Sequence, residues 1–338
     1  MNTRPYKLLT IAIPTYNRAS YLDKCLSHIC GQLRKGEPRV EILISDNNST
    51  DNTPDIADRY ISDGFAVNYI RNAENIGSDR NFLQCFGRAN GRYVLILGDD
   101  DILLDGSVEK ILDILEGDEY GIVHLRSYGF AGDFISERPK GYFRGYTVYT
   151  DPKKFARRAN YFLTFTSVNI VNKVLAGRDP DVGKFVDTNL VQLGWTFSAL
   201  LNSRKNVFVK EYLIAAQLYN SGGYGLCEVF GVKFNKISNV FVDKGVDREV
   251  IEIINKKMLL KFFPANIIRS RMHIINTEEE NYFKILYPLY HRYMYFWIFT
   301  LPAIVLPSKI AYFLFSFMNF ARRFTVTIRS VLDRYFLL

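Results

Sequence analysis

Three consecutive acidic residues follow a short apolar run over residues 93–97. The carboxylates of Asp99, Asp100 and Asp101 repel one another, so a fold tolerates them mainly where a cation or solvent neutralises their charge. At a strand end Asp99 and Asp101 point the same way, which suits a hard divalent ion held by one or two carboxylates and by substrate phosphates. The competing interpretation is a solvated acidic turn that caps a helix near Asp105.

A second polar cluster, residues 13–18, ends another apolar run. Its Tyr16 offers a ring face to a nucleobase, and Thr15 with the local backbone offers polar contacts. Because a turn next to one aromatic residue is common, this cluster alone indicates little.

Two more polar clusters cover residues 45–51 and 75–81. In the first, Asp46 can accept a hydrogen bond from a base N–H; the competing interpretation is an Asx-rich turn with a helix cap. In the second, Arg80 could reach a base or a phosphate, and the competing interpretation is an ordinary solvated charge on a helix.

Alternating strand and helix patterns in the first 130 residues position these clusters. Short apolar runs typical of buried strands cover residues 8–13, 40–44, 66–70 and 93–97, and helical patterns cover 21–29, a segment from Asp55, and 81–86. Apolar strands separated by helices predict a parallel sheet covered on both faces, and such sheets bind ligands at the carboxyl ends of their strands. We expect every polar cluster named above to lie at such an end.

Taken together, the four clusters closely resemble the nucleotide-binding half of the family 2, GT-A-fold glycosyltransferases. In that family the first strand ends in Pro-Thr-Tyr-Asn, as at residues 14–17, and the second ends in an Asp followed by small polar residues. An Asn-x-Gly…Arg-Asn segment then leads to an Asp-x-Asp motif, as at 75–81 and 99–101. The match covers roughly residues 7–125, and it looks more narrowly like the bacterial O-antigen and capsule transferases, the abequosyltransferase-like group among them.

The resemblance implies roles for individual residues. The implied nucleotide-sugar-binding set in the first half of the chain is Pro14, Thr15, Tyr16, Asn17, Arg18, Asp46, Asn75, Arg80, Asp99 and Asp100. Within it Thr15 and Tyr16 would contact the base, and Asp46 would bind the base edge. Asp101, with Asp99, would be the ligand of Mn2+ or Mg2+, and this metal would carry most of the diphosphate's charge.

The catalytic base is harder to assign. An inverting transferase needs a group, usually a carboxylate, that takes the proton of the acceptor hydroxyl. Members of the family often have a Glu-Asp pair before a helix, which this sequence lacks; Asp187 is the candidate, with Asp179 and Asp181 as alternatives. Asp187 directly precedes a helix predicted over residues 188–202, so it could equally be the N-cap.

Three other residues could be structural or functional. Gln192 and Trp195 are candidates for donor or acceptor sugar contacts, Trp195 by stacking, although core packing is the favoured role of Trp195. His124 lies in an apolar run, so we expect a core histidine with its hydrogen bonds satisfied.

Composition narrows the class of protein. The chain has 338 residues, 48% hydrophobic, with a net charge of +8, which favours a folded protein with an anionic partner. Four cysteines without metal or disulfide spacing indicate thiols in a reducing cytosol, and no apolar signal-peptide segment follows the N-terminus. Twelve basic and five acidic residues in 251–338 place +7 of this charge in the last quarter.

The last 46 residues form a distinct tail. From Tyr293 to Ala321 only Lys309 is charged, and Pro302 and Pro307 interrupt the apolar run, which predicts a shallow hairpin or a pair of interfacial helices. A basic amphipathic helix suited to an anionic membrane face then carries Arg322, Arg323, Arg329 and Arg334. A dimer interface or core, and a true membrane span, are the alternatives.

The sequence therefore predicts an α/β protein with a GT-A fold, meaning a Rossmann-like, mostly parallel sheet with flanking helices, plus a helical membrane-associating C-terminal region. The expected parts are a transferase domain over 1–228 (nucleotide-sugar half 1–125, acceptor half 126–228), a basic helical region over 229–292 and the tail over 293–338.

The expected reaction moves a sugar from a nucleotide-diphosphate sugar to a polyprenyl-diphosphate-linked saccharide in O-antigen or capsule synthesis. The expected location is the inner face of the bacterial cytoplasmic membrane, peripheral or monotopic, without nucleic acid and with a homo-oligomer possible. The rival interpretations are a catalytically idle membrane scaffold of the same fold and a basic nucleic-acid-binding protein. The acidic triplet disfavours the second, because phosphate backbones avoid acidic clusters.

Overall fold

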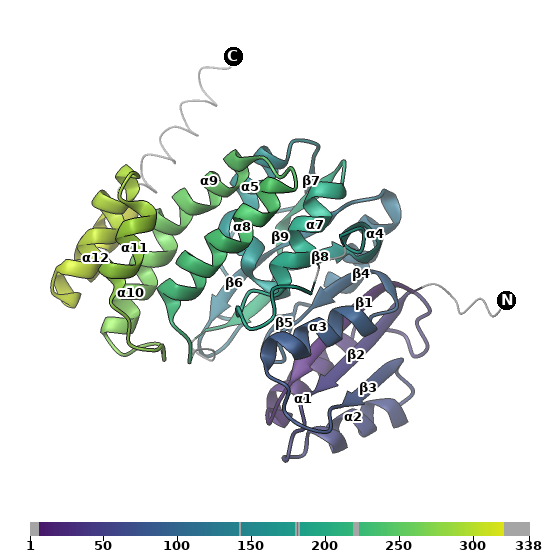
Figure 1. Cartoon of the computed structure of the whole chain (residues 1–338). Coiled ribbons are helices and arrows are strands. Elements are labelled where there is room, and N and C mark those ends of the chain that lie inside the picture. Colours follow the sequence, from purple (N-terminus) through teal and green to yellow (C-terminus); the bar gives the residue numbers. More distant parts are fainter. Residues whose placement is uncertain (1–6, 142, 180, 182, 219–222, 321–338) are drawn as a thin grey trace. The chain divides into compact units, whose positions relative to one another are not determined.

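The computed structural model describes residues 7–141, 143–179, 181, 183–218 and 223–320 (Figure 1). The chain divides into two compact units, Met1–Asn220 with Lys233–Ile254, and Ser221–Val232 with Asn255–Leu338. Each unit is described by itself below. The functional division at residues 228 and 292 stays a prediction.

A nine-stranded sheet forms the centre of the first unit, in the order β3-β2-β1-β4-β8-β6-β9-β5, with β7 paired to β9. The strands are β1 (Lys7–Thr15), β2 (Val40–Asp46), β3 (Val67–Arg71), β4 (Gly91–Ile96), β5 (Ile102–Leu103), β6 (Ile122–Phe130), β7 (Tyr146–Tyr149), β8 (Asn169–Asn172) and β9 (Asn206–Gln217). The predicted parallel pairing is confirmed for β3, β2, β1 and β4. Beyond β4 the sheet is mixed, because β8 pairs antiparallel to both β4 and β6 while β6 and β9 are parallel.

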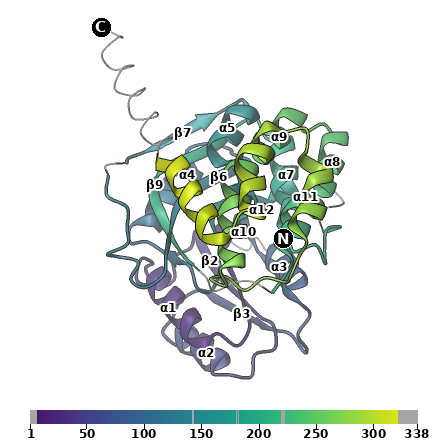
Figure 2. The same ribbon diagram turned by 90° about the vertical axis from the view of Figure 1, so that its left-hand side faces the viewer.

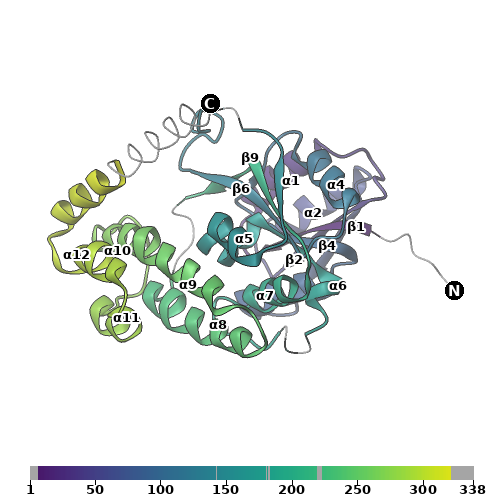
Figure 3. The same ribbon diagram turned by 90° about the horizontal axis from the view of Figure 1, so that it is seen from above.

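Helices cover both faces of this sheet (Figures 1 and 3). They are α1 (Ala19–Cys30), α2 (Thr53–Ser62), α3 (Ser78–Arg88), α4 (Ser107–Gly117), α5 (Pro152–Ala159), α6 (Lys173–Ala176), α7 (Gln192–Asn202) and α8 (Phe234–Asp243), with the single turns η1 (Asn160–Thr164) and η2 (Thr166–Val168). The residues of β1 with odd numbers, Leu9 to Ile13, pack on α1, α2 and α4 in one buried cluster. On the other face Phe86 of α3 stacks on Trp195 of α7. The strand and helix patterns of the first 130 residues are thus confirmed.

The second unit is helical, as predicted for the chain beyond residue 228 (Figure 2). It contains most of η3 (Glu228–Lys233), the end of α9 (Arg248–Lys257), η4 (Met258–Phe262), α10 (Phe263–Arg271), α11 (Tyr282–Tyr290), η5 (Phe296–Thr300), α12 (Leu301–Val305) and a helical segment over 308–320. Phe263, Tyr290 and Phe296 are fully buried in its core. Arg271 donates to the carbonyls of Ala303 and Leu306, which closes the end of α12.

The tail keeps the break that its prolines predict, because α12 ends before Pro307 and a new helix follows. Among the residues that the structure describes, no helix is long and apolar enough to cross a membrane. The predicted basic amphipathic helix with Arg322, Arg323, Arg329 and Arg334 lies outside the described residues.

Candidate functional site

The acidic triplet lies beside the end of β1, as the parallel pairing of β1 and β4 requires. Thr15 Oγ1 donates to Asp99 Oδ2 at 2.8 Å, and Arg18 Nη1 donates to Asp99 Oδ1 at 2.7 Å. The other terminal nitrogen of Arg18 donates to Asp100 Oδ2 at 3.1 Å. Two clusters about eighty residues apart in sequence therefore form one site, in which Arg18 holds two of the three carboxylates.

Asp101 has different partners from its two neighbours. Its Oδ1 accepts a hydrogen bond from the backbone N–H of Gln217, at the end of β9, at 3.0 Å. Its carboxylate also bonds the hydroxyl of Ser167, whose Oγ accepts the N–H of Gly98 at 3.0 Å. Sequence reasoning missed Ser167 and Gln217, because they come from η2 and β9 and carry no motif of their own.

Burial makes it costly to keep the carboxylates of the triplet ionised. Asp99 and Asp101 are each 3% exposed, so the interpretation of the triplet as a solvated turn is wrong for both. Burial raises the pKa of Asp99 to about 6, although the Arg18 guanidinium opposes the shift. Burial, followed by the charge of Asp100, also raises the pKa of Asp101. In the described part of the chain, Arg18 is the cation within ion-pair distance of Asp99 and Asp100, and Asp101 forms no ion pair there.

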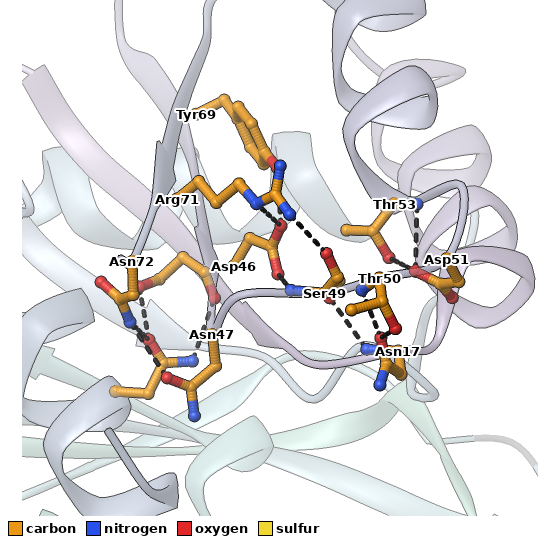
Figure 4. A network of polar contacts seen from close by, with 12 residues as sticks. Asn17, Asp46, Asn47, Ser49, Thr50, Asp51, Thr53, Tyr69, Arg71 and Asn72 are labelled. Atoms are coloured by element: carbon orange, nitrogen blue, oxygen red, sulfur yellow. Dashed lines mark hydrogen bonds and ion pairs between the residues drawn. The ribbon is translucent and has the colours of Figure 1, made fainter. Parts of the chain in front are cut away.

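Asp46 is the centre of a polar network at the end of β2 (Figure 4). It is fully buried; its Oδ1 accepts the N–H of Ser49 at 2.8 Å, and its Oδ2 accepts the hydroxyl of Tyr69 at 2.6 Å. Arg71 lies 3.8 Å from the same oxygen and donates to the Ser49 carbonyl. Asp46 is therefore fixed in place by β3 and by its own turn.

The same turn is joined to the end of β1. Asn17, at φ 53°, accepts the N–H of Thr50 at 2.7 Å and donates its own N–H to Ser49. Asp51 accepts from the N–H of Thr53 at the start of α2, so the Asx-turn interpretation is confirmed for this residue (Figure 4). Tyr16, next to Asn17, leaves 43% of its surface exposed and its ring accessible.

The first turn of α3 connects the nucleotide half to the candidate base. Arg80 Nη2 donates to Asp187 Oδ2 at 2.9 Å, and both side chains are more than half exposed. Asp79 is buried, and its Oδ2 accepts the N–H groups of Thr188 and Asn189, each at 2.8 Å. Neighbouring residues of one helix thus bind both the side chain and the backbone of the loop at 187–189.

This loop corrects the predicted helix over 188–202. Asp187 and Asn189 adopt φ values of 68° and 60°, in the left-handed region that Asp and Asn tolerate but that ends a right-handed helix. Consequently α7 begins only at Gln192, and the prediction of Asp187 as its N-cap is wrong.

The other candidates occupy structural positions. Asp179 is 8% exposed, and both of its oxygens accept from Lys244 at 2.8 Å, while Asp181 also pairs with Lys244. Asn75 Oδ1 accepts from Asn47 at 2.7 Å and so supports the loop before α3. Pro14 lies within β1, opposite Ser45 of β2, directly before Thr15.

Gln192 and Trp195 face the interior of the first unit. Trp195 is 3% exposed and stacks on Phe86 with ring centroids 4.6 Å apart, so its core-packing role is confirmed. Gln192 Nε2 donates to the Thr164 carbonyl at 2.6 Å. Its Oε1 has no hydrogen-bond partner in the described part of the chain, and Gln192 lines a small cavity together with Asn169.

The mixed sheet with helices on both faces has the architecture of a GT-A fold. The solved structure of S. aureus TarS 1-349 has this fold, with a TM-score of 0.57 at 18% identity, covering 88% of this chain and 80% of TarS 1-349. The same fragment in complex with UDP-GlcNAc gives a TM-score of 0.56 at 19% identity, over 78% of this chain and 74% of that one.

Sequence comparison identifies the family. Residues 10–173 match the family model Glycosyl transferase family 2. The match covers just under half of the chain, and this segment is a family 2 glycosyltransferase domain.

Three relatives illustrate its range. Abequosyltransferase RfbV of Salmonella typhimurium is 44% identical over 110 residues, 32% of this chain and 33% of RfbV. The GalNAc(5)-diNAcBac-PP-undecaprenol beta-1,3-glucosyltransferase of Campylobacter jejuni is 31% identical over 105 residues, 31% of this chain and 33% of that protein. The putative teichuronic acid biosynthesis glycosyltransferase TuaG of Bacillus subtilis is 30% identical over 108 residues, 32% of this chain and 42% of TuaG. The chain thus matches only about a third of the length of the first two relatives.

Proposed function

We propose that the chain is an inverting, metal-dependent glycosyltransferase of bacterial cell-surface polysaccharide synthesis. It transfers a sugar from a nucleotide-diphosphate sugar to a polyprenyl-diphosphate-linked saccharide at the inner face of the cytoplasmic membrane. The observation that carries the proposal is the junction of Thr15 and Arg18 with the buried acidic triplet. The similarity to the abequosyltransferase RfbV supports sugar transfer, and the undecaprenol-linked substrate named for the C. jejuni relative supports the acceptor class.

The carboxylate oxygens of the triplet are suitable ligands for Mn2+ or Mg2+. Asp99 and Asp101 supply carboxylate oxygens, the ligands that hard cations prefer, in a buried site with more negative than positive charge. The described residues contain no group of three or more ligating side chains, so any other ligands would have to come from substrate phosphates and water. We therefore assign the metal to Asp101 and Asp99. When bound, the ion supplies positive charge to the departing diphosphate.

The chain's own residues bind the donor and activate the acceptor. The exposed ring of Tyr16 stacks on the base. The family resemblance assigns the base edge to Asp46, which would have to exchange a bond to Tyr69 or Ser49 for one to the base, because its carboxylate is buried between them. Arg80 binds the nucleotide. Asp187 takes the proton from the acceptor hydroxyl, since its carboxylate is exposed, whereas Asp179 is buried against Lys244.

Thermal unfolding with a panel of nucleotide-diphosphate sugars tests donor binding. One sugar nucleotide should raise the unfolding temperature when Mn2+ is present and much less with EDTA, because a ligand of the native state stabilises it. Transfer of the labelled sugar to a lipid-linked acceptor extract then tests the reaction.

Two variants make the test specific. Asp101→Asn should lose both responses, whereas Asp118→Asn, which removes an exposed acid paired with Lys205, should keep them. Donor binding without any transfer by the wild-type chain would instead favour the idle scaffold. No response to any sugar nucleotide would refute the proposal.

A further inference from the structure

The second unit exposes large apolar side chains along two segments. In the first, Phe283 stacks on Tyr287 at 5.0 Å between ring centroids, and Tyr287 contacts the rings of His291 and Trp297. Three of these rings, those of Phe283, Tyr287 and Trp297, are 39–46% exposed. We call Phe283, Tyr287, His291 and Trp297 the aromatic cluster.

The second segment is the helix over 308–320. Ile310, Phe313 and Phe317 are 56%, 75% and 61% exposed, and their spacing of three and four residues places them on one side of the helix. Ala311, which this spacing places elsewhere on the helix, is 2% exposed. We call Ile310, Phe313 and Phe317 the apolar helix face. A soluble protein rarely exposes neighbouring phenylalanines to this extent without an interaction partner.

Residues 281–320 carry positive charge alone, because they contain no Asp or Glu while Lys284, Arg292 and Lys309 are exposed. Three acidic residues, Glu278, Glu279 and Glu280, directly precede this stretch. Ion pairs within the described ranges involve none of the three cations. The exposed apolar groups therefore lie among cations that make no ion pair in the described part of the chain.

We propose that the apolar helix face and the aromatic cluster bind the surface of an anionic bilayer. The helix face enters the boundary between headgroups and acyl chains, Tyr287 and Trp297 lie at headgroup level, and Lys284, Arg292 and Lys309 contact lipid phosphates. This inference rests on the proposed function for the membrane location alone. It adds the chemical nature of the partner, an anionic bilayer, and the residues that contact it.

Charge complementarity decides between a bilayer and the other possible occupants. A second copy would bring the same three cations against this surface, and like charges repel. The segment 321–338 also has the same sign, with four arginines and one aspartate. Lipid phosphates carry the complementary charge.

Vesicle flotation of the full chain tests the proposal. The probes are vesicles of phosphatidylcholine alone and vesicles that also contain phosphatidylglycerol. The wild-type chain should float with the anionic vesicles, and each basic residue near the surface contributes about fivefold to partitioning. Exchanging Lys284, Arg292 and Lys309 together for Gln should therefore weaken binding to the anionic vesicles by about 100-fold.

Apolar insertion is tested separately. Phe313→Ser with Phe317→Ser should lower partitioning at least about tenfold, including in high salt, because the loss is of buried apolar area rather than charge. The matched control is Ile135→Ser with Val174→Ser, which removes side chains that are 71% and 54% exposed in the first unit and should leave flotation unchanged.

Three results would overturn the inference: no flotation of the wild-type chain, unchanged flotation of both test variants, or a wild-type dimer that the Phe313/Phe317 variant converts to monomer. The thermal response to nucleotide sugar and Mn2+ is measured on the same proteins. If the wild-type chain shows no thermal response, the result counts against the proposed function. If it shows the response but does not float, the result counts against this inference alone.

Discussion

Acid should remove the contribution that one buried histidine, His124 of β6, makes to stability. The side chain is 4% exposed, and its Nδ1 lies 2.8 Å from Asn169 Oδ1. The amide nitrogen of Asn169 already donates to the carbonyls of Phe162 and Phe165, so its oxygen is the acceptor and His124 Nδ1 carries the proton. His124 is thus a neutral imidazole of one defined tautomer, which confirms the predicted core histidine.

The size of the His124 contribution to the free energy of unfolding follows from its pKa shift. Burial lowers the pKa of His124 from 6.5 to about 4, although the hydrogen bond to Asn169 opposes the change. Between these values His124 binds a proton in the unfolded chain but not in the folded one, so its contribution to the free energy of unfolding falls as pH falls. From about pH 7.5 to about pH 5 the loss is about 2 kcal/mol, and it levels off at about 3 kcal/mol below about pH 4.

Urea unfolding of the wild-type chain and of His124→Asn at both pH values measures this term. The asparagine amide replaces Nδ1 as donor to Asn169 but does not titrate, and the lost stacking on Phe208 cancels when each protein is compared with itself. The wild-type chain should lose about 2 kcal/mol more than the variant on acidification. Nitrogen-15 NMR should show His124 neutral at about pH 5. Equal losses in both proteins, or a charged His124 at that pH, would refute the reasoning.

Three further variants probe the site. Asp101→Asn should reduce transfer by at least about 100-fold without lowering stability, because the amide oxygen can still accept from Gln217 and a buried charge is removed. Residual activity above a few per cent would remove Asp101 as principal ligand. Ser167→Ala should raise the Mn2+ concentration for half-maximal activity about tenfold, because residues that hydrogen-bond to metal ligands orient those ligands. An unchanged concentration would leave Ser167 with a purely structural role. Asp187→Asn should lower kcat about 100-fold with donor affinity near normal, and retained kcat would transfer the base to another carboxylate.

The sequence was sufficient for the half of the fold in which local pattern and topology agree. Apolar runs such as residues 40–44 become strands buried on both faces, and β2 is buried along its whole length. Parallel pairing then brings the ends of β1 and β4 together, so the sequence alone predicts that Thr15 and Asp99 lie in one site. Their contact follows from the repeating strand-helix unit, which periodicity reveals.

The parts that could not be predicted depend on partners distant in sequence. The residues at 187–189 read as the start of a helix, but hydrogen bonds from Thr188 and Asn189 to Asp79 hold them in a turn. Helix propensity is a weak preference that such tertiary contacts override. Ser167 is equally invisible, because a serine in an irregular turn gains a role only when η2 packs against Gly98.

The acidic residues of the first unit are of two kinds, those that stabilise the fold and those that the reaction needs. Asp179 is buried and paired with the partly exposed Lys244, and Asp46 has Tyr69, Ser49 and the nearby Arg71. The triplet is different: burial raises the pKa of Asp99 and Asp101 despite Arg18, which means that the folded protein holds these carboxylates at a cost in stability. A buried cluster with unmatched charge is easily relieved by substitution, so its presence is better explained by a ligand that supplies the missing charge. A divalent cation with a nucleotide diphosphate is such a ligand, and it connects the electrostatics of this edge to sugar transfer.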